Sequence, residues 1–295
     1  MRAYWDTVRP GLDLKPQPPP QSAGTLHVVA TPIGNLGDFS PRAVETLKAV
    51  AAICAEDTRR TRPLLQQFGI DTPLIALHEH NEDDIAARLV ARLVAGESLA
   101  LVSDAGTPLI SDPGYRLVAA TRAAGIRISP VPGPSALIAA LSAAGLPSDR
   151  FVFEGFLPAK SGARRERLQA LAGESRTLIF YEASHRIGAM LEDAASVLGG
   201  ERRAVIAREL TKLFETVLDG GLAVLLQRVN EDPNQQKGEF VVLVEGAGDD
   251  ADARLAEGRR VQALLAKELP PSKAAKLAAE ITGAPRKALY GGTTD

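Results

Sequence analysis

Short apolar runs recur along the first half of the chain, and each one ends in a polar or a glycine- and proline-rich turn. The runs read LHVVA, AAICA, LIAL, LALV and IRISPV, in this order, between residues 26 and 131. Most of them precede a segment whose apolar positions repeat with helical spacing, such as Val44, Leu47 and Val50. This alternation predicts an α/β fold in which parallel strands are covered by helices on both faces.

The same pattern resumes in the second half of the chain with the runs RFVFEGFLP, TLIFYEASHR, AVIARELTK and GEFVVLVEG. The linker GLPSD, Gly145–Asp149, separates the two series. We therefore expect an N-terminal α/β domain over residues 25–147 and a second α/β domain over residues 148–248. The proline-rich residues 1–24 lack apolar periodicity and are predicted to form a disordered lead-in.

Residues 249–295 are predicted to form a small helical extension. They contain RLAEGRRVQALLAKEL, SKAAKLAAEIT, a turn at Gly283 and PRKALY. Two short helices around a Thr-Gly turn are typical of a helix-turn-helix. A simple helical cap on the preceding domain is an equal alternative.

Composition limits the classes of partner and the compartment. The formal net charge of −2 over 295 residues argues against a protein that coats nucleic acid, so a polyanionic partner would need a local basic patch. The one cysteine, Cys54, cannot form an intrachain disulfide, which fits the reducing cytoplasm, and its apolar neighbours indicate a core residue. No apolar run approaches the length of a membrane span, and no signal peptide is apparent, so we expect a cytoplasmic protein without membrane contact.

The segment LVSDAGTPLISDPG, residues 101–114, ends a strand-like run in two turns built from small residues. Small residues let a ligand approach the backbone, and ligands of open α/β sheets bind outside the carboxyl ends of the strands. We therefore favour a binding loop over a plain connection. The segment TPIGNLGD, residues 31–38, lacks the G-x-G-x-x-G spacing of dinucleotide sites, which disfavours a dehydrogenase.

Two histidine-bearing segments have open interpretations. The segment HEHNEDD offers His78 and His80, but no third histidine or cysteine at ligand spacing, so we expect no metal and interpret Asn81 with Asp84 as a helix cap. The segment YEASHR, residues 181–186, holds acid–base groups. Its alternative interpretation is a strand end at which Ser184 caps the next helix.

Clustered cations are the candidates for binding phosphate, although each alone is more typical of a solvated, self-paired surface. They are Arg59, Arg62, Lys160, Arg164, Lys273, Lys276, Arg286 and Lys287.

Ten motifs in a fixed order resemble one family. They are TPIGNLGD, AEDTRRT, LLQQFGI, HEHNE, LVSDAGTPLISDPG, PGPSA, GFLP, IFYE with a following HR, ARELTK and GEFVVLVEG. Together they resemble the small-subunit ribosomal RNA 2′-O-methyltransferase I family of the tetrapyrrole methylase superfamily, over residues 26–246, and the tail resembles its C-terminal extension. The family usually has Ser-Pro where this chain has Ala183 and Ser184.

The resemblance implies two α/β domains with S-adenosylmethionine in the cleft between them, and a homodimer. It implies methylation of the 2′-hydroxyl of a cytidine in small-subunit ribosomal RNA, cytidine 1402 of 16S rRNA, as free RNA or within the assembled subunit. The other functions considered are methylation of a small tetrapyrrole and RNA binding without catalysis.

The resemblance also assigns residues to the cofactor cleft. They are Pro32, Ile33, Gly34, Asn35, Leu36, Ser103, Asp104, Ala105, Gly106, Thr107, Asp112, Pro113, Gly114, Pro132, Gly133, Pro134, Ser135, Phe180, Tyr181, Arg208, Glu209 and Leu210.

The expected reaction needs alignment of the ribose oxygen opposite the sulfonium sulfur, and a group that accepts the hydroxyl proton. The sequence does not rank the catalytic candidates, which are Glu56, Asp57, Arg59, Glu182, His185 and Glu209.

Overall fold

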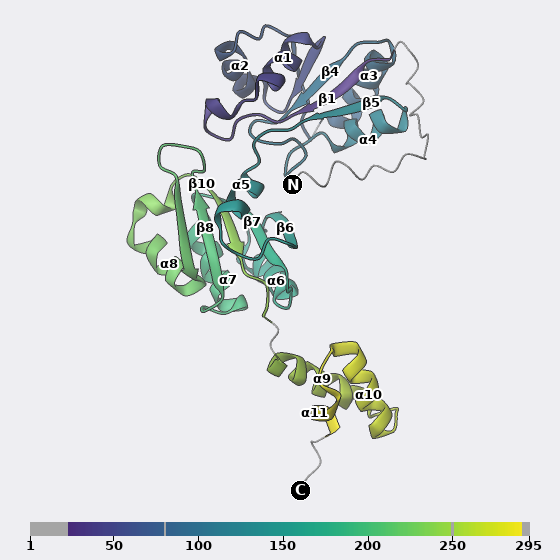
Figure 1. The fold of residues 1–295 in the computed structure, drawn as a ribbon, viewed down its shortest axis with the longest axis vertical. Coiled ribbons are helices and arrows are strands. Elements are labelled where there is room, and N and C mark those ends of the chain that lie inside the picture. Colours follow the sequence, from purple (N-terminus) through teal and green to yellow (C-terminus); the bar gives the residue numbers. More distant parts are fainter. Residues whose placement is uncertain (1–22, 80, 249–250, 291–295) are drawn as a thin grey trace, which may run out of the picture.

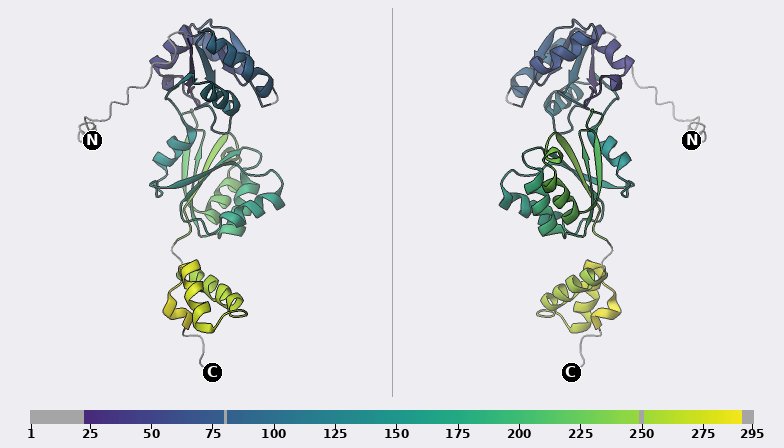
Figure 2. Two further views of the ribbon diagram at one scale, coloured as in Figure 1. Left: turned by 90° about the vertical axis from the view of Figure 1, so that its right-hand side faces the viewer. Right: turned by 90° about the vertical axis from the view of Figure 1, so that its left-hand side faces the viewer.

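The computed structural model describes residues 23–79, 81–248 and 251–290. Two five-stranded sheets follow one another along the chain, and a bundle of three helices comes after them (Figures 1 and 2). The predicted lead-in before residue 23 and His80 lie outside the described residues. None of the helices in the described part of the chain combines the length and apolar character that crossing a membrane requires.

The first sheet is entirely parallel, as the alternation of strands and helices predicts. Its strands are β1 (Thr25–Val29), β2 (Ala52–Ala55), β3 (Leu74–Ala76), β4 (Leu99–Val102) and β5 (Arg127–Val131). They lie in the order β3-β2-β4-β1-β5, with Leu26 opposite Leu99 in the central pair.

Helices cover both faces of this sheet because alternate residues of each buried strand point to opposite sides. They are α1 (Pro41–Ala49), α2 (Thr58–Gln67), α3 (Glu82–Val94) and α4 (Tyr115–Ala123), with a short 3-10 turn at Leu36–Asp38. Ile53 packs with the side chains of α1 and α2, whereas Cys54 packs with those of α3 and α4. Cys54 is fully buried and burial raises the pKa of its thiol to about 12, which confirms it as a core residue.

Helices α1 and α3 begin at the N-cap residues that the sequence predicts. The backbone N–H of Ala43 donates to Ser40 Oγ at 3.1 Å, and Pro41 occupies the first helical position, as predicted. Asn81 is the N-cap residue of α3, as predicted, but its side chain makes no cap hydrogen bond to the helix. It accepts instead from the N–H of His78 at 2.8 Å, in the turn that precedes α3.

The second sheet is mixed, so the expectation of parallel strands is wrong for this half. Its strands are β6 (Phe151–Phe156), β7 (Thr177–Ala183), β8 (Arg203–Arg208), β9 (Thr216–Gly221) and β10 (Glu239–Val244), in the order β6-β7-β10-β8-β9. Only β6 and β7 pair in parallel among these strands. The chain returns from β8 through the hairpin strand β9, and β10 then inserts between β7 and β8. Strand β9 has no continuous apolar run because it lies at an edge and no residue of it is fully buried.

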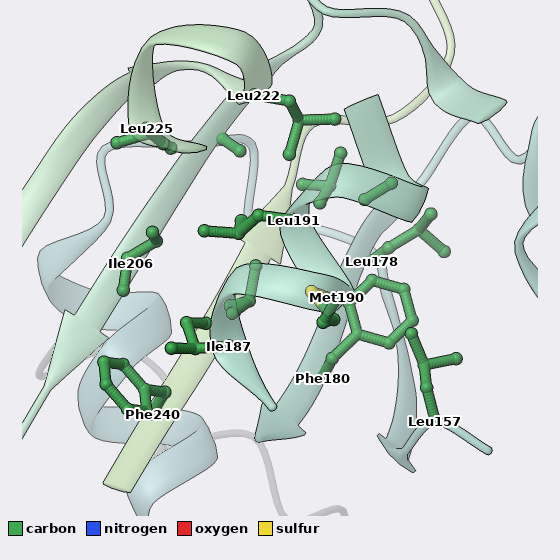
Figure 3. Close-up of a cluster of buried hydrophobic side chains, with 14 of the residues drawn as sticks. Leu157, Leu178, Phe180, Ile187, Met190, Leu191, Ile206, Leu222, Leu225 and Phe240 are labelled. Atoms are coloured by element: carbon green, nitrogen blue, oxygen red, sulfur yellow. The ribbon is translucent and has the colours of Figure 1, made fainter. Parts of the chain in front are cut away.

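Four helices cover the second sheet. They are α5 (Ala136–Ala143), α6 (Ser161–Leu171), α7 (Ile187–Leu198) and α8 (Leu222–Glu231), with a 3-10 turn at Pro233–Gln236. Phe180, Met190 and Leu191 belong to the largely aliphatic core beneath α6, α7 and α8 (Figure 3). Leu137 and Leu141 of α5 pack on the opposite face, so this helix covers the second sheet although it precedes the expected domain boundary at residue 147. That boundary remains a prediction.

The C-terminal helices form a bundle with its own small core. They are α9 (Ala251–Leu265), α10 (Pro271–Thr282) and α11 (Arg286–Tyr290). Gly283 ends α10 with a left-handed φ of 69°, a conformation that glycine adopts at little cost. Ala275, Ala278 and Leu289 are buried where the helices meet.

Candidate active site

A cavity of about 400 Å³ lies at the carboxyl ends of the strands of the first sheet and is closed by residues of the second sheet. The first half contributes Ile33 after β1, Glu56 and Arg60 after β2, and residues 104–107 and 110–112 after β4. The second half contributes Phe156 at the end of β6 and Tyr181 on β7. The binding loops predicted from the sequence therefore border one cavity.

The loops after β1, β4 and β5 are tied to one another. The backbones of Thr31 and Gly106 exchange two hydrogen bonds, of 2.9 and 3.1 Å. The Thr107 hydroxyl donates to the carbonyl oxygen of Pro134 at 2.9 Å. Gly106 has a φ of +83°, and a Cβ placed on it would lie 3.2 Å from Ile33 Cγ2. This position needs glycine both for its backbone conformation and for the close approach of the two loops.

Carboxyl groups gather in the wall of the cavity. Asp104 accepts the backbone N–H of Asp57 at 3.1 Å and pairs with Arg60 at 3.2 Å. Burial raises the pKa of Glu56, and the nearby Asp104 carboxylate raises it further. Burial, followed by repulsion from Glu56, raises the pKa of Asp112 to about 7. Because nearby carboxylates oppose the ionisation of Glu56 and Asp112, the cavity favours a positively charged ligand.

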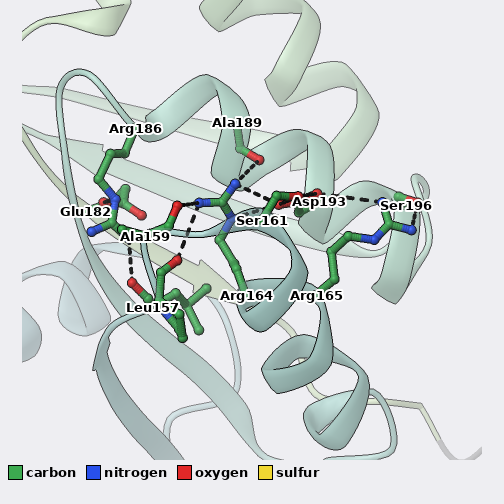
Figure 4. A network of polar contacts seen from close by, with 11 residues as sticks. Leu157, Ala159, Ser161, Arg164, Arg165, Glu182, Arg186, Ala189, Asp193 and Ser196 are labelled. Atoms are coloured by element: carbon green, nitrogen blue, oxygen red, sulfur yellow. Dashed lines mark hydrogen bonds and ion pairs between the residues drawn. The ribbon is translucent and has the colours of Figure 1, made fainter.

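Tyr181 and Glu182 enter the wall from strand β7. The Tyr181 oxygen accepts the N–H of Leu137 at 3.1 Å, so its own hydroxyl hydrogen remains available to donate. Its ring packs edge-on against Phe153 and Phe156, with centroids 4.9 and 5.8 Å away. The Glu182 carboxylate is buried and pairs with Arg186 Nε at 3.0 Å, and Arg186 also donates to the carbonyl of Leu157 (Figure 4).

About half of the residues assigned to the cleft by resemblance border the cavity. They are Ile33, Asp104, Ala105, Gly106, Thr107, Asp112, Ser135, Tyr181 and Leu210. The remainder do not form part of its wall, and some of them have clear structural roles. Phe180 is buried in the core, and Arg208 donates to the carbonyl oxygens of Lys237 and Phe214 beside the β8–β9 hairpin. A Cβ on Gly114 would lie 2.7 Å from Leu101 Cδ2, so this glycine serves packing.

The structure places only some of the catalytic candidates at the cavity. Glu56 and Glu182 border the cavity. Asp57 accepts the N–H of Arg59 at the start of α2 and pairs with its guanidinium at 3.0 Å, whereas 89% of the Arg59 side chain is exposed. His185 borders a second, shallow pocket with Ser184 and Lys237.

The loop between β7 and α7 corrects one interpretation. Helix α7 begins at Ile187 with Arg186 at its N-cap position, and no side chain caps it. The alternative that Ser184 caps this helix is therefore wrong.

The basic candidates also fall into two groups. Arg62, Lys160, Lys273, Lys276, Arg286 and Lys287 are exposed. Arg164 is only 3% exposed, and its guanidinium binds the Asp193 carboxylate with an Nε–Oδ2 distance of 2.7 Å (Figure 4). The nomination of Arg164 for RNA binding is therefore corrected, because helix α6 turns this side chain into the protein.

Several wall residues escaped the sequence interpretation. Arg60 lies between Arg59 and Arg62, the two candidates for phosphate binding. Its side chain pairs with Asp104 because of its position on α2. Phe156 and Lys212 lie within the motifs GFLP and ARELTK of the second half, but neither was assigned to the cleft. Lys212 pairs with Glu209 and Glu239, each at 2.8 Å. Within the described residues, no three His, Cys, Asp or Glu side chains gather in a way that would hold a metal ion.

Comparisons with known proteins agree with this fold. The family described as Tetrapyrrole (Corrin/Porphyrin) Methylases matches residues 25–225, and the RsmI C-terminal HTH domain matches residues 252–291. The second match favours the helix-turn-helix over a simple cap. The solved structure of the methyltransferase CobJ superposes with a TM-score of 0.56 and 21% identity, covering 76% of this chain and 95% of that one. Diphthine synthase superposes with a TM-score of 0.55, 15% identity and coverage of 76% and 90%.

Sequence relatives extend over nearly the whole chain. A Xylella fastidiosa (strain Temecula1) protein named ribosomal RNA small subunit methyltransferase I is 70% identical over 269 residues, which are 91% of this chain and 98% of that protein. A protein of the same name from Pseudomonas aeruginosa is 61% identical and covers 91% of this chain and 96% of its own length. The chain therefore belongs to the ribosomal RNA small subunit methyltransferase I family, whose main part has the tetrapyrrole methylase fold.

Proposed function

We propose that this protein transfers the methyl group of S-adenosylmethionine to the 2′-hydroxyl of a ribose in small-subunit ribosomal RNA, that of cytidine 1402 in 16S rRNA. The observation that carries the proposal is the acidic cavity bounded by the glycine- and proline-rich loops of the family motifs. The names of the relatives supply the substrate class. The proposal includes a homodimer that acts in the cytoplasm.

The cavity fits this cofactor. Its volume of about 400 Å³ lies in the range of about 300–1,000 Å³ typical of small-molecule sites. Glu56, Asp104 and Asp112 give the wall an excess of carboxyl groups, which suits the positive charge of a sulfonium. Apolar surface from Ile33 and Phe156 suits the uncharged parts of the molecule. When bound, the cofactor supplies an activated methyl carbon.

The chain's own residues would then bind and orient the two reactants. The linked loops at Thr31, Gly106 and Pro134 form a rigid wall against which the cofactor is held. Rigid placement accounts for much of the catalysis expected here, because correct alignment replaces an improbable encounter. The exposed cations Arg59 and Arg62, beside the same loops, would hold RNA phosphate.

The test is a transfer assay with S-adenosylmethionine carrying a radiolabelled methyl group. Three acceptors are compared: small ribosomal subunits lacking the modification, the naked RNA of those subunits, and a tetrapyrrole precursor. We expect label in one or both RNA acceptors and none in the tetrapyrrole. Label in the tetrapyrrole alone, or in no acceptor although the cofactor binds, would contradict the proposal.

We predict that Gly106→Val weakens binding of S-adenosylmethionine at least tenfold while the protein stays folded. A branched side chain at this φ pushes the loop away from Ile33 and disturbs the wall. Gly125→Val is the matched control, because Gly125 has a φ of +70° but no atom within 4 Å of a placed Cβ. Calorimetric titration should give the wild-type affinity for the control. Equal affinities of the two variants would show that the loop contact is unimportant.

A further inference from the structure

Asp112 is a carboxyl group of the cavity wall whose negative charge is not balanced by an ion pair within the described residues. Among the described residues, no arginine or lysine forms an ion pair with it. The two cations of the wall are already engaged, since Arg60 pairs with Asp104, and Lys212 pairs with Glu209 and Glu239. An aspartate in this position has no partner that would hold it permanently ionised.

The backbone around Asp112 is held in an unusual conformation. Leu109 and Ser111 have φ values of 75° and 69°, which side chains with a Cβ rarely adopt. Strain of this kind persists where the surrounding structure imposes it, and it concentrates at functional sites.

The opposing strand supplies the constraint. Strand β6 changes register between Phe153 and Gly155, and a Cβ on Gly155 would lie 3.0 Å from Ser111 Oγ. The bulge and the missing side chain let the loop of the first half press against the second half. Asp112 is thereby fixed where the two halves meet over the cavity.

The groups around Asp112 are the charged and titratable residues of the cavity wall. They are Glu56, Arg60, Asp104, Tyr181, Glu182, Lys212 and Glu239. The carboxylates of Glu56 and Asp104 oppose its ionisation, and a hydrogen bond from the Ser103 hydroxyl favours it. Burial is the largest influence and raises the pKa of Asp112 to about 7, so near neutral pH the group is ready to accept a proton and able to release it.

We propose that Asp112 is the proton acceptor of the methyl transfer, an assignment that rests on the proposed function. A lone pair of the ribose 2′-oxygen forms the new O–C bond while the C–S bond breaks and its electron pair stays on sulfur. The 2′-hydroxyl proton passes to an Asp112 carboxylate oxygen. The products are a methyl ether, a neutral thioether and a protonated Asp112, which returns its proton to water.

Three of the catalytic candidates from the sequence, Glu56, Glu182 and His185, interact with other groups or border another pocket. Glu56 accepts the backbone N–H of Asp104 and interacts with Arg60. Glu182 is buried with its carboxylate paired to Arg186, and His185 borders a different pocket.

The first test compares Asp112→Asn with Asp71→Asn, which alters an exposed aspartate outside the cavity. Because Asp112 belongs to the wall that binds the cofactor, the variant is assayed at saturating S-adenosylmethionine, and we expect Asp112→Asn to transfer methyl at least about 100-fold more slowly than wild type. The single-turnover rate of the wild type should rise with pH up to about 7 and then level off. Asp112→Asn should lose this dependence, and Asp71→Asn should keep it.

The second test measures thermal stability and needs no substrate. Because the folded pKa of Asp112 lies above its ordinary value of 3.8, the folded protein holds the proton more tightly than the unfolded chain. The contribution of Asp112 to stability is then fully present below about pH 4 and is lost as the pH rises through about 7. Asp112→Asn removes the buried charge and should raise Tm at about pH 8, with little effect at about pH 5.

The outcomes are distinct. The assignment of Asp112 would be overturned if Asp112→Asn transferred methyl at the wild-type rate, or if its rate still rose with pH up to about 7. Either result would leave the proposed function standing. A lower Tm of Asp112→Asn than of wild type at about pH 8 would also overturn the assignment. If the wild-type protein methylates neither RNA acceptor, the proposed function fails and this assignment fails with it.

Discussion

Arg164→Ala is expected to lower the free energy of unfolding by about 3–5 kcal/mol, because it leaves the buried Asp193 carboxylate with one longer ion pair, to the half-exposed Arg165 at 3.6 Å. Asp193 is 5% exposed and accepts from Arg164 Nε at 2.7 Å and from the Ser161 hydroxyl at 3.0 Å. The guanidinium also donates to the carbonyl of Ala159 at 3.2 Å, so one side chain joins helices α6 and α7 to the preceding loop (Figure 4). Urea unfolding of the full chain measures the change.

Arg167→Ala provides the control on the same helix. Arg167 pairs with Glu154 at 2.7 Å, and the two side chains are 48% and 11% exposed, so solvent reaches this pair from the arginine side. Because solvent screens such a pair, we expect Arg167→Ala to lower the free energy of unfolding by only about 1 kcal/mol. If the two variants lose equal stability, burial of the Arg164 pair has no special energetic effect and the interpretation of this network is wrong.

The sequence contained the signal that Arg164 is buried. Arg164, Leu168 and Leu171 are spaced as neighbours on one helical face, and all three are buried. The composition of the cluster KSGARRER predicts a basic surface, whereas the helical spacing of Arg164 with Leu168 and Leu171 predicts that Arg164 is buried. The charge of a residue shows what it can bind, whereas its helical position shows whether it is accessible.

Truncation after Gly248 is expected to weaken RNA binding strongly and to flatten its dependence on salt. The four tail cations Lys273, Lys276, Arg286 and Lys287 are exposed, and α9–α11 pack around their own core. Each lost phosphate contact lowers the slope of log affinity against log salt by about 0.9. Affinity for S-adenosylmethionine should be unchanged, because all cavity-lining residues precede residue 249.

Binding of the full chain and the truncated chain to small-subunit RNA, measured over a range of salt concentrations, tests this expectation. A quadruple alanine variant at the four cations separates loss of charge from loss of the fold. An unchanged slope in both proteins would mean that the helix-turn-helix bundle makes no phosphate contacts.

Much of the fold could be predicted from local pattern, and the failures have a common cause. The five strands of the first sheet are short apolar runs because both faces of a parallel sheet are covered. Strand order in the second sheet depends on contacts between distant segments, such as Val242 opposite Phe180, which no local pattern reports. Strand β9 could not be predicted because it lies at the edge of the sheet, where exposed and partly buried residues alternate and no apolar run forms.

In the site, too, local sequence patterns identify some parts and not others. The loops after β1, β2, β4 and β5 could be identified because glycine and proline mark turns, and the carboxyl ends of strands mark a crevice. The closing wall could be identified only in part, because Phe156 and Lys212 lie within two of the family motifs but neither residue type by itself indicates that its side chain borders a cavity. The proposed role of Asp112 depends on its burial and on its position relative to Glu56, both of which only the folded chain creates.

Alkaline hydrolysis of the product shows whether the transferred methyl group is on the ribose or on the base. RNA labelled by the enzyme is hydrolysed completely in alkali, which cleaves the chain by attack of each 2′-oxygen on the adjacent phosphate. A methylated 2′-oxygen cannot attack, so the account predicts that the label appears in a dinucleotide that alkali does not cleave and that begins with cytidine. Label in a mononucleotide would show methylation of a base and would contradict the account.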